Sequence, residues 1–183
     1  MSRIPTPARI EDAPAASQAL LTAVKQKLGV SPNLFRLVAN SPAALEGYVS
    51  LFDAIGKGSL PAATHERIAL AIAEINGCSY CLSAHTYLGK HVAKLDDAEM
   101  TANRNGMSND PKADAAVRFA AKVARARGHI DQADFEAVRQ AGYDDAQIIE
   151  IVLHVALNTW TNYINEVAAT DIDFPLVAAR KAA

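Results

Sequence analysis

The sequence predicts an all-α fold of roughly eight or nine helices, in a single domain that spans residues 1–183. Apolar residues recur at helical spacing through most of the chain, and no stretch shows the period-two alternation of a half-buried strand. Residues that favour helix N-termini stand before many of these periodic segments, and glycine follows many of them. A chain of 183 residues is long enough to bury a sizeable core in one domain.

Start and stop signals delimit the helices in order. Ser31-Pro32 and Ser41-Pro42 each resemble an N-cap followed by proline at the first helical position. Asp96 and Asp144 each precede a Glu or Gln three residues later, which is the pattern of a capping box. The expected helices cover residues 17–28, 32–38, 42–55, 61–75, 78–92, 96–105, 111–127, 132–140 and 144–169. Residues 1–14, with three prolines, are expected to form an extended arm, and residues 170–183 a C-terminal tail.

Composition excludes several classes of partner. The formal net charge is −2, which gives no reason to expect nucleic acid or an anionic membrane surface as a partner. No apolar run approaches the roughly 18 residues that a membrane span needs. The first residues also lack the apolar core of a signal peptide. The expected location is the cytoplasm, where a Cys-x-x-Cys pair is more often redox-active or metal-binding than a structural disulfide.

The chemistry of the chain is concentrated between residues 60 and 92. Both cysteines, Cys78 and Cys81, lie here, and His85 follows the second cysteine by four residues. Residues three, four and seven apart share one face of a helix, so the two thiols and the imidazole converge if helix holds from Cys78 onward. A neighbouring imidazole favours the thiolate, and a second thiol one turn away can trap an oxidised cysteine as a disulfide.

Asn76-Gly77 interrupts the helical periodicity just before the cysteines, and Asn-Gly is a good helix terminator. A sharp turn there would set two helices antiparallel and bring Glu66 and His85 to comparable heights. In one straight helix these two residues would be about 28 Å apart. A continuous helix would instead put Glu74 one turn from Cys78.

These residues resemble the AhpD-like alkylhydroperoxidase branch of the carboxymuconolactone decarboxylase family. Glu66, Cys78, Cys81 and His85 form the pattern E-x11-C-x2-C-x3-H, and the added Glu74 is similar to the peroxidase-related members. The resemblance covers residues 30–175 and includes a late helix with three asparagines, Asn158, Asn162 and Asn165. It implies a multihelical AhpD-like bundle. One departure is Tyr80, where the well-studied AhpD enzymes have histidine before the second cysteine.

The resemblance implies a thiol-dependent peroxidase with no bound cofactor or metal. In this mechanism His85 accepts the proton of Cys81 and Glu66 orients the imidazole, which is the nucleophile–base–orienter pattern. The Cys81 thiolate attacks a hydrogen or organic peroxide, and Cys78 condenses with the resulting sulfenic acid. A dihydrolipoyl group or a thioredoxin-like protein would restore the dithiol. A helix-dipole argument instead favours Cys78 as the attacking thiol, whereas His85 and the resemblance favour Cys81.

The resemblance also implies a homo-oligomer, because AhpD-like proteins assemble as trimers or hexamers. The last long helix has a wider apolar girth than one core-facing stripe, which favours the same expectation. The arm and the tail have too little periodicity to pack as helices, so we expect them to contact neighbouring subunits.

Other interpretations remain open at this point. The cysteines could be plain core residues, or a zinc site completed by His85 and a carboxylate, although no second cysteine pair exists. An acid–base enzyme of the decarboxylase kind is a further alternative, and so is a redox-sensing module without turnover.

Overall fold

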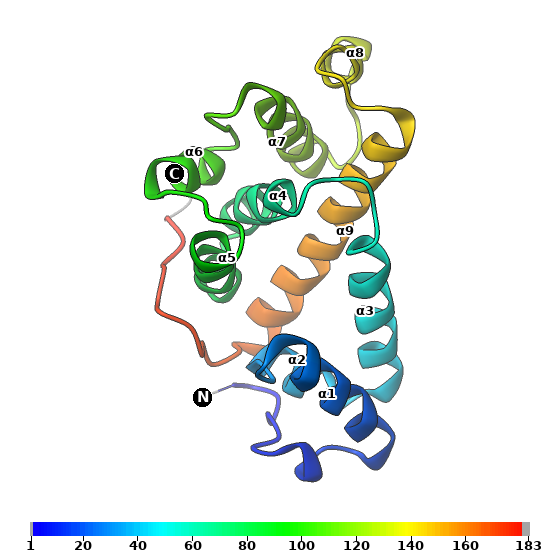
Figure 1. The fold of residues 1–183 in the computed structure, drawn as a ribbon. Helices are drawn as coiled ribbons and strands as arrows, with labels where there is room; N and C mark the ends of the chain where they lie inside the picture. Colours follow the sequence, from blue (N-terminus) through cyan, green and yellow to red (C-terminus); the bar gives the residue numbers. More distant parts are fainter. Residues whose placement is uncertain (1, 181–183) are drawn as a thin grey trace.

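The computed structural model describes residues 2–180, and every regular element in that part of the chain is helical, as predicted (Figure 1). The elements in chain order are the 3-10 helix η1 (Ile10–Asp12) and the helices α1 (Ala15–Leu28), α2 (Asn33–Val38), α3 (Pro42–Ile55), α4 (Ala62–Ile75), α5 (Ser79–His91), α6 (Asp97–Arg104), α7 (Pro111–Arg125), α8 (Gln132–Gln140) and α9 (Asp145–Ala168). The observed ends lie within about two residues of most predicted ends. None of the helices in residues 2–180 is long and apolar enough to cross a membrane.

Local capping signals explain where several helices begin. The Ser41 side chain accepts a hydrogen bond from the Ala44 amide at the start of α3. At the start of α9, Asp144 and Gln147 form the predicted capping box, in which each side chain binds the other residue's backbone amide. Such caps satisfy amides that have no partner within the helix.

Two predicted caps differ from the structure. Asp96 caps α6 as expected, but Glu99 does not complete the box, because its carboxylate accepts hydrogen bonds from Arg67 and from the loop before α7. At α2 the N-cap is Pro32 rather than Ser31, whose side chain makes no capping hydrogen bond. The Asn33 amide is instead bound by the carboxylate of Asp173, 140 residues further along the chain.

The core has two parts, and α4 contributes to both. Helix α4 packs against α5, α6, α7 and α9, and its residues Ile68, Leu70 and Ile72 are completely buried. Figure 1 shows α9 with α3 on one side and α4 and α5 on the other. One hydrophobic cluster lies between α4, α7, α8 and α9, and the other joins α1, α2 and α3 to the start of α5. The two cysteines belong to this second cluster.

The N-terminal arm and the C-terminal tail both pack on their own chain. The Arg3 amide donates to the Ala168 carbonyl at the end of α9 (2.6 Å). The tail runs in extended form along α5, where the Val177 and Ala179 amides donate to the hydroxyls of Ser83 and Ser79. The predicted extended tail is therefore present as far as residue 180, and the rest of it (181–183), like Met1, lies outside the described residues.

Candidate active site

The turn at Asn76-Gly77 sets the geometry of the site. Helix α4 ends at Ile75, and Gly77 takes a positive φ of 69°, a conformation that glycine adopts without strain. Helix α5 then begins at Ser79 and packs against α4. The predicted turn is confirmed, and the alternative of one continuous helix is wrong.

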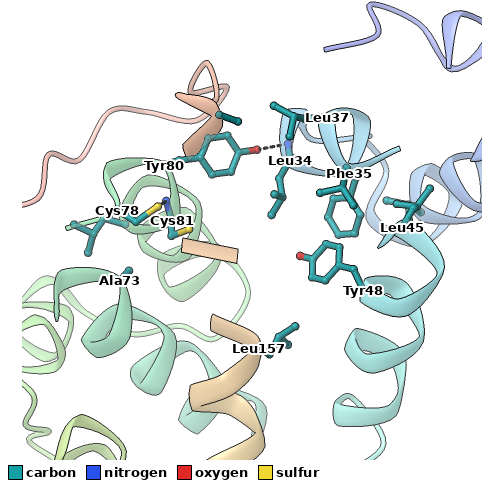
Figure 2. Packing of buried hydrophobic residues seen from close by; sticks show 14 of the residues in the cluster. Leu34, Phe35, Leu37, Leu45, Tyr48, Ala73, Cys78, Tyr80, Cys81 and Leu157 are labelled. Atoms are coloured by element: carbon teal, nitrogen blue, oxygen red, sulfur yellow. Dashed lines mark hydrogen bonds between the residues drawn. The ribbon is translucent and has the colours of Figure 1, made fainter. Parts of the chain in front are cut away.

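The two cysteines lie at the start of α5, and both are free thiols. Cys78 is the N-cap residue, and its sulfur accepts a hydrogen bond from the Cys81 amide (3.3 Å). Both side chains are buried, and Figure 2 shows them next to each other beside Ala73 of α4. The pair is therefore held close together in the core rather than displayed on the surface.

His85 and Glu66 form the contact that the turn was expected to permit. His85 Nδ1 lies 2.8 Å from Glu66 Oε2, and both side chains are largely buried. Burial alone lowers the pKa of His85, but the charge of Glu66 and its hydrogen bond outweigh that effect and raise it. Because Nδ1 is engaged with a carboxylate, Nε2 is the nitrogen left to exchange a proton.

Cys81 has surroundings that favour its thiolate. Burial is the largest influence and raises the pKa of Cys81, but hydrogen bonds from Cys78 and Asn165, the charge of His85 and the nearby amide of Asn162 together lower it to about 7. The Asn165 side-chain amide donates to the sulfur at 3.3 Å. An electropositive neighbour and hydrogen-bond donors are what stabilise a thiolate in a buried setting.

The pKa of Cys78 shifts in the opposite direction. Its hydrogen bond to Cys81 is the main cause of the rise, followed by burial and by the negative charge of the Cys81 thiolate. One thiol of the pair is thus poised to ionise while the other keeps its proton. Position at the helix N-terminus does not by itself make Cys78 the more acidic thiol.

The asparagines of α9 are the part of the site to which the sequence assigned no role. Asn162 and Asn165 are buried on the face of α9 that meets α5. Asn162 accepts a hydrogen bond from Asn76 at the turn (2.9 Å), while Asn165 donates to Cys81. They lie on a buried part of α9 that also carries Asn158 and Thr161. This run of polar residues in a buried helix was a usable signal, because buried amides need partners.

Glu74, the second carboxylate candidate, points elsewhere. Its side chain pairs with Arg104 of α6 (2.5 Å) and accepts a hydrogen bond from the Arg180 amide of the tail (2.8 Å). It makes no hydrogen bond with either cysteine or with His85 among the described residues. The structure brings together four of the five predicted site residues, and Glu74 braces the tail.

Tyr80, the residue before the second cysteine, also has a bracing role. Its hydroxyl accepts a hydrogen bond from the Leu34 amide and donates to Asp173 (2.9 Å), so it links α5 to α2 and to the tail. In residues 2–180 no group of three or more His, Cys, Asp and Glu side chains is arranged to hold a metal ion.

Comparison with known proteins gives the context of this geometry. The sequence model of the carboxymuconolactone decarboxylase family matches residues 42–126, which include the whole of α4 and α5. The sequence matches none of the curated proteins with which it was compared.

Solved structures extend the likeness to nearly the whole chain. A peroxidase-related protein from Ralstonia eutropha JMP134, described as an alkylhydroperoxidase AhpD core, is 25% identical with a TM-score of 0.83, covering 94% of this chain and 92% of the other. A peroxidase-related protein from Silicibacter sp. TM1040 is also 25% identical, with a TM-score of 0.78 and coverage of 92% and 88%. The debrominase Bmp8, solved with 2,3,4-tribromopyrrole, shares the fold at 22% identity, a TM-score of 0.75 and coverage of 92% and 90%.

Proposed function

We propose that this chain is a thiol-dependent peroxidase of the carboxymuconolactone decarboxylase family, whose model matches residues 42–126 and whose AhpD-like fold it shares. The observation that carries the proposal is the convergence of a low-pKa thiol, a histidine paired with a carboxylate, and a second thiol. Cys81 is the attacking residue, His85 the base, Glu66 its positioning partner and Cys78 the resolving thiol. The substrate is hydrogen peroxide or an organic peroxide.

The first half of the cycle oxidises Cys81. Its proton passes to His85 Nε2, and the charge of Glu66 stabilises the resulting imidazolium. The thiolate attacks one peroxide oxygen, so an S–O bond forms as the O–O bond breaks. The other oxygen leaves as an alkoxide or hydroxide and takes a proton from the imidazolium. Sulfur has then lost two electrons to the peroxide, and Cys81 is a sulfenic acid.

The second half of the cycle restores the dithiol. The Cys78 sulfur attacks the sulfenic sulfur, an S–S bond forms, and the hydroxyl group leaves as water with the Cys78 proton. An external dithiol, dihydrolipoyl or thioredoxin-like, then reduces the disulfide by two exchange steps and is itself oxidised. No bound cofactor takes part in this cycle.

Peroxide consumption with single-cysteine variants tests the proposal. The wild-type protein should consume many equivalents of peroxide with dihydrolipoamide or thioredoxin and lose two titratable thiols per chain in a single turnover. In Cys78→Ser, peroxide should leave Cys81 as a sulfenic acid that a dimedone probe labels. In Cys81→Ser, Cys78 should label slowly or not at all.

The same experiment distinguishes the competing functions. Oxidation once without turnover would indicate a redox sensor. Absence of any thiol oxidation would favour acid–base chemistry of the decarboxylase kind. Labelling of Cys78 in Cys81→Ser, without labelling of Cys81 in Cys78→Ser, would exchange the two roles.

A further inference from the structure

A cluster of aromatic side chains beside the cysteines contains a hydroxyl that binds no described protein group. The rings of Phe35, Phe52 and Trp160 lie 4.8, 6.2 and 5.2 Å from the ring of Tyr48. Tyr48 is only 8% exposed, and its hydroxyl makes no hydrogen bond with any described residue. The hydroxyl oxygen is not among the fully buried side-chain oxygens that lack a partner, so it keeps contact with solvent. The buried Tyr80 differs, because its hydroxyl binds two protein groups.

Packing alone does not account for this hydroxyl. Two neighbours in the cluster, Phe35 and Phe52, fill the same kind of space without a polar atom. Buried tyrosines usually direct their hydroxyl to a hydrogen-bond partner, whereas this hydroxyl has solvent contact and no described protein partner. A phenylalanine at position 48 would fill the place of the ring equally well, and the hydroxyl is available to donate to a small bound molecule.

The hydroxyl is directed toward the reactive thiol. Figure 2 shows it pointing from the ring of Tyr48 toward the side of the cluster on which Cys81 lies. The two residues belong to the same buried cluster. Burial raises the pKa of Tyr48, and the negative charge of the Cys81 thiolate raises it further. Tyr48 therefore keeps its proton wherever Cys81 is ionised.

We propose that the Tyr48 hydroxyl is a substrate-binding group of this site, which donates a hydrogen bond to the peroxide oxygen that leaves when the Cys81 sulfur attacks. This inference rests on the proposed peroxidase function. As the O–O bond breaks, negative charge develops on the leaving oxygen, and a preoriented donor stabilises that charge. The proton itself comes from the His85 imidazolium, so Tyr48 stays protonated throughout. Trp160, which is 39% exposed, packs against the ring of Tyr48.

The Tyr48→Phe variant tests the assignment, because it keeps the ring and removes only the hydroxyl. The rate constant for single-turnover oxidation of Cys81 by peroxide, measured by quenched flow and thiol counting, should fall about 10- to 100-fold. Alkylation of Cys81 by iodoacetamide should keep its rate and pH profile, since that reaction has no leaving oxygen to stabilise. Tyr143→Phe, which changes a buried tyrosine of the other hydrophobic cluster, is the matched control and should oxidise at the wild-type rate.

Three outcomes would overturn the proposal. Oxidation of Tyr48→Phe at the wild-type rate would remove the hydroxyl from the reaction while leaving the peroxidase function intact. Equal slowing of oxidation and alkylation would mean that Tyr48 acts on the thiol rather than on the peroxide. A wild-type protein that peroxide does not oxidise would end the peroxidase function, and this inference with it.

Discussion

The two thiols differ in acidity because of the side chains around Cys81. The cysteines are three residues apart on the same helix end, yet the pKa of Cys81 is lowered to about 7 and that of Cys78 is raised. His85 and two asparagines of α9 surround Cys81 electrostatically, whereas Cys78 faces the Cys81 thiolate. The hydrogen bond from Cys78 and the charge of His85, which Glu66 supports, therefore set how much Cys81 thiolate exists near neutral pH.

The pH dependence of Cys81 alkylation should show how His85 and Glu66 affect the pKa of the thiol. The thiolate is the reacting form, so the rate should rise as pH increases through about 7 and level off above it. Glu66→Gln keeps the shape of the side chain but removes the charge that favours the imidazolium, so the midpoint should move to higher pH. His85→Ala should move it further and cut peroxide turnover by about 10²- to 10⁴-fold. Stopped-flow alkylation over pH 5–10 measures the midpoint of each variant, and peroxide consumption measures the turnover.

Glu74→Gln is the matched control, because it alters a carboxylate on the same helix that pairs with Arg104. Its alkylation midpoint should equal that of the wild type. A shifted midpoint in Glu74→Gln with a normal one in Glu66→Gln would show that Glu74, and not Glu66, is the carboxylate that supports His85.

The site residues that are close together in the sequence could be predicted, and those that come from distant helices could not. Cys78, Cys81 and His85 share one helix, so spacing alone was enough to group them. The Glu66 contact required only one additional element, the Asn76-Gly77 turn. Tyr48 lies on α3, before the cysteines, and Asn162 lies on α9, far after them. Their position relative to the cysteines depends on tertiary packing, which helical periodicity does not encode.

The same distinction holds for the helices and the segments that join them. Capping residues and periodicity are local, so the sequence predicted which segments are helical. The cap of α2 comes from Asp173, and the carboxylate of Glu99 serves Arg67 instead of its own helix. The tail also has no periodic signal, because its amides bind individual side chains of α5 rather than a partner strand.

Glu74 should contribute to stability by holding the tail against α4 and α6. Its carboxylate serves Arg104 and the Arg180 amide, and the side chains of the ion pair are 11% and 18% exposed. Glu74→Gln leaves a largely buried arginine without its counter-charge, so the free energy of unfolding should fall by about 1–3 kcal/mol, less than for a fully buried pair. Urea unfolding at fixed protein concentration measures the change.

The exposed ion pair between Lys90 and Asp97 provides the comparison. Lys90→Gln should change stability by about 0.5 kcal/mol or less. If Glu74→Gln is no less stable than Lys90→Gln, the brace contributes little. If Glu74→Gln instead loses peroxide turnover at full stability, the carboxylate belongs to the reaction.

The N-terminal arm and the C-terminal tail pack on their own chain, but one face of α9 remains exposed. The arm and tail were expected to contact neighbouring subunits, whereas the structure shows both bound to their own chain. They therefore no longer argue for an oligomer. The argument that remains comes from α9, whose exposed residues include a regular apolar series: Ile149, Leu153, Ala156, Trp160, Tyr163 and Val167.

We expect a second copy of the chain to cover this series, giving a trimer or a hexamer. The residues recur at alternating steps of four and three, the spacing by which helices pair side by side. Ile149 and Tyr163 stand about 21 Å apart along α9, and both are more than half exposed. Light scattering at micromolar concentration should give a mass of three or six times 19.5 kDa. The double variant Ile149→Glu with Tyr163→Glu should dissociate, because it buries two carboxylates in an apolar contact. Glu136→Gln on α8 should leave the mass unchanged. A wild-type mass of one chain, with activity that does not depend on dilution, would show that α9 needs no partner.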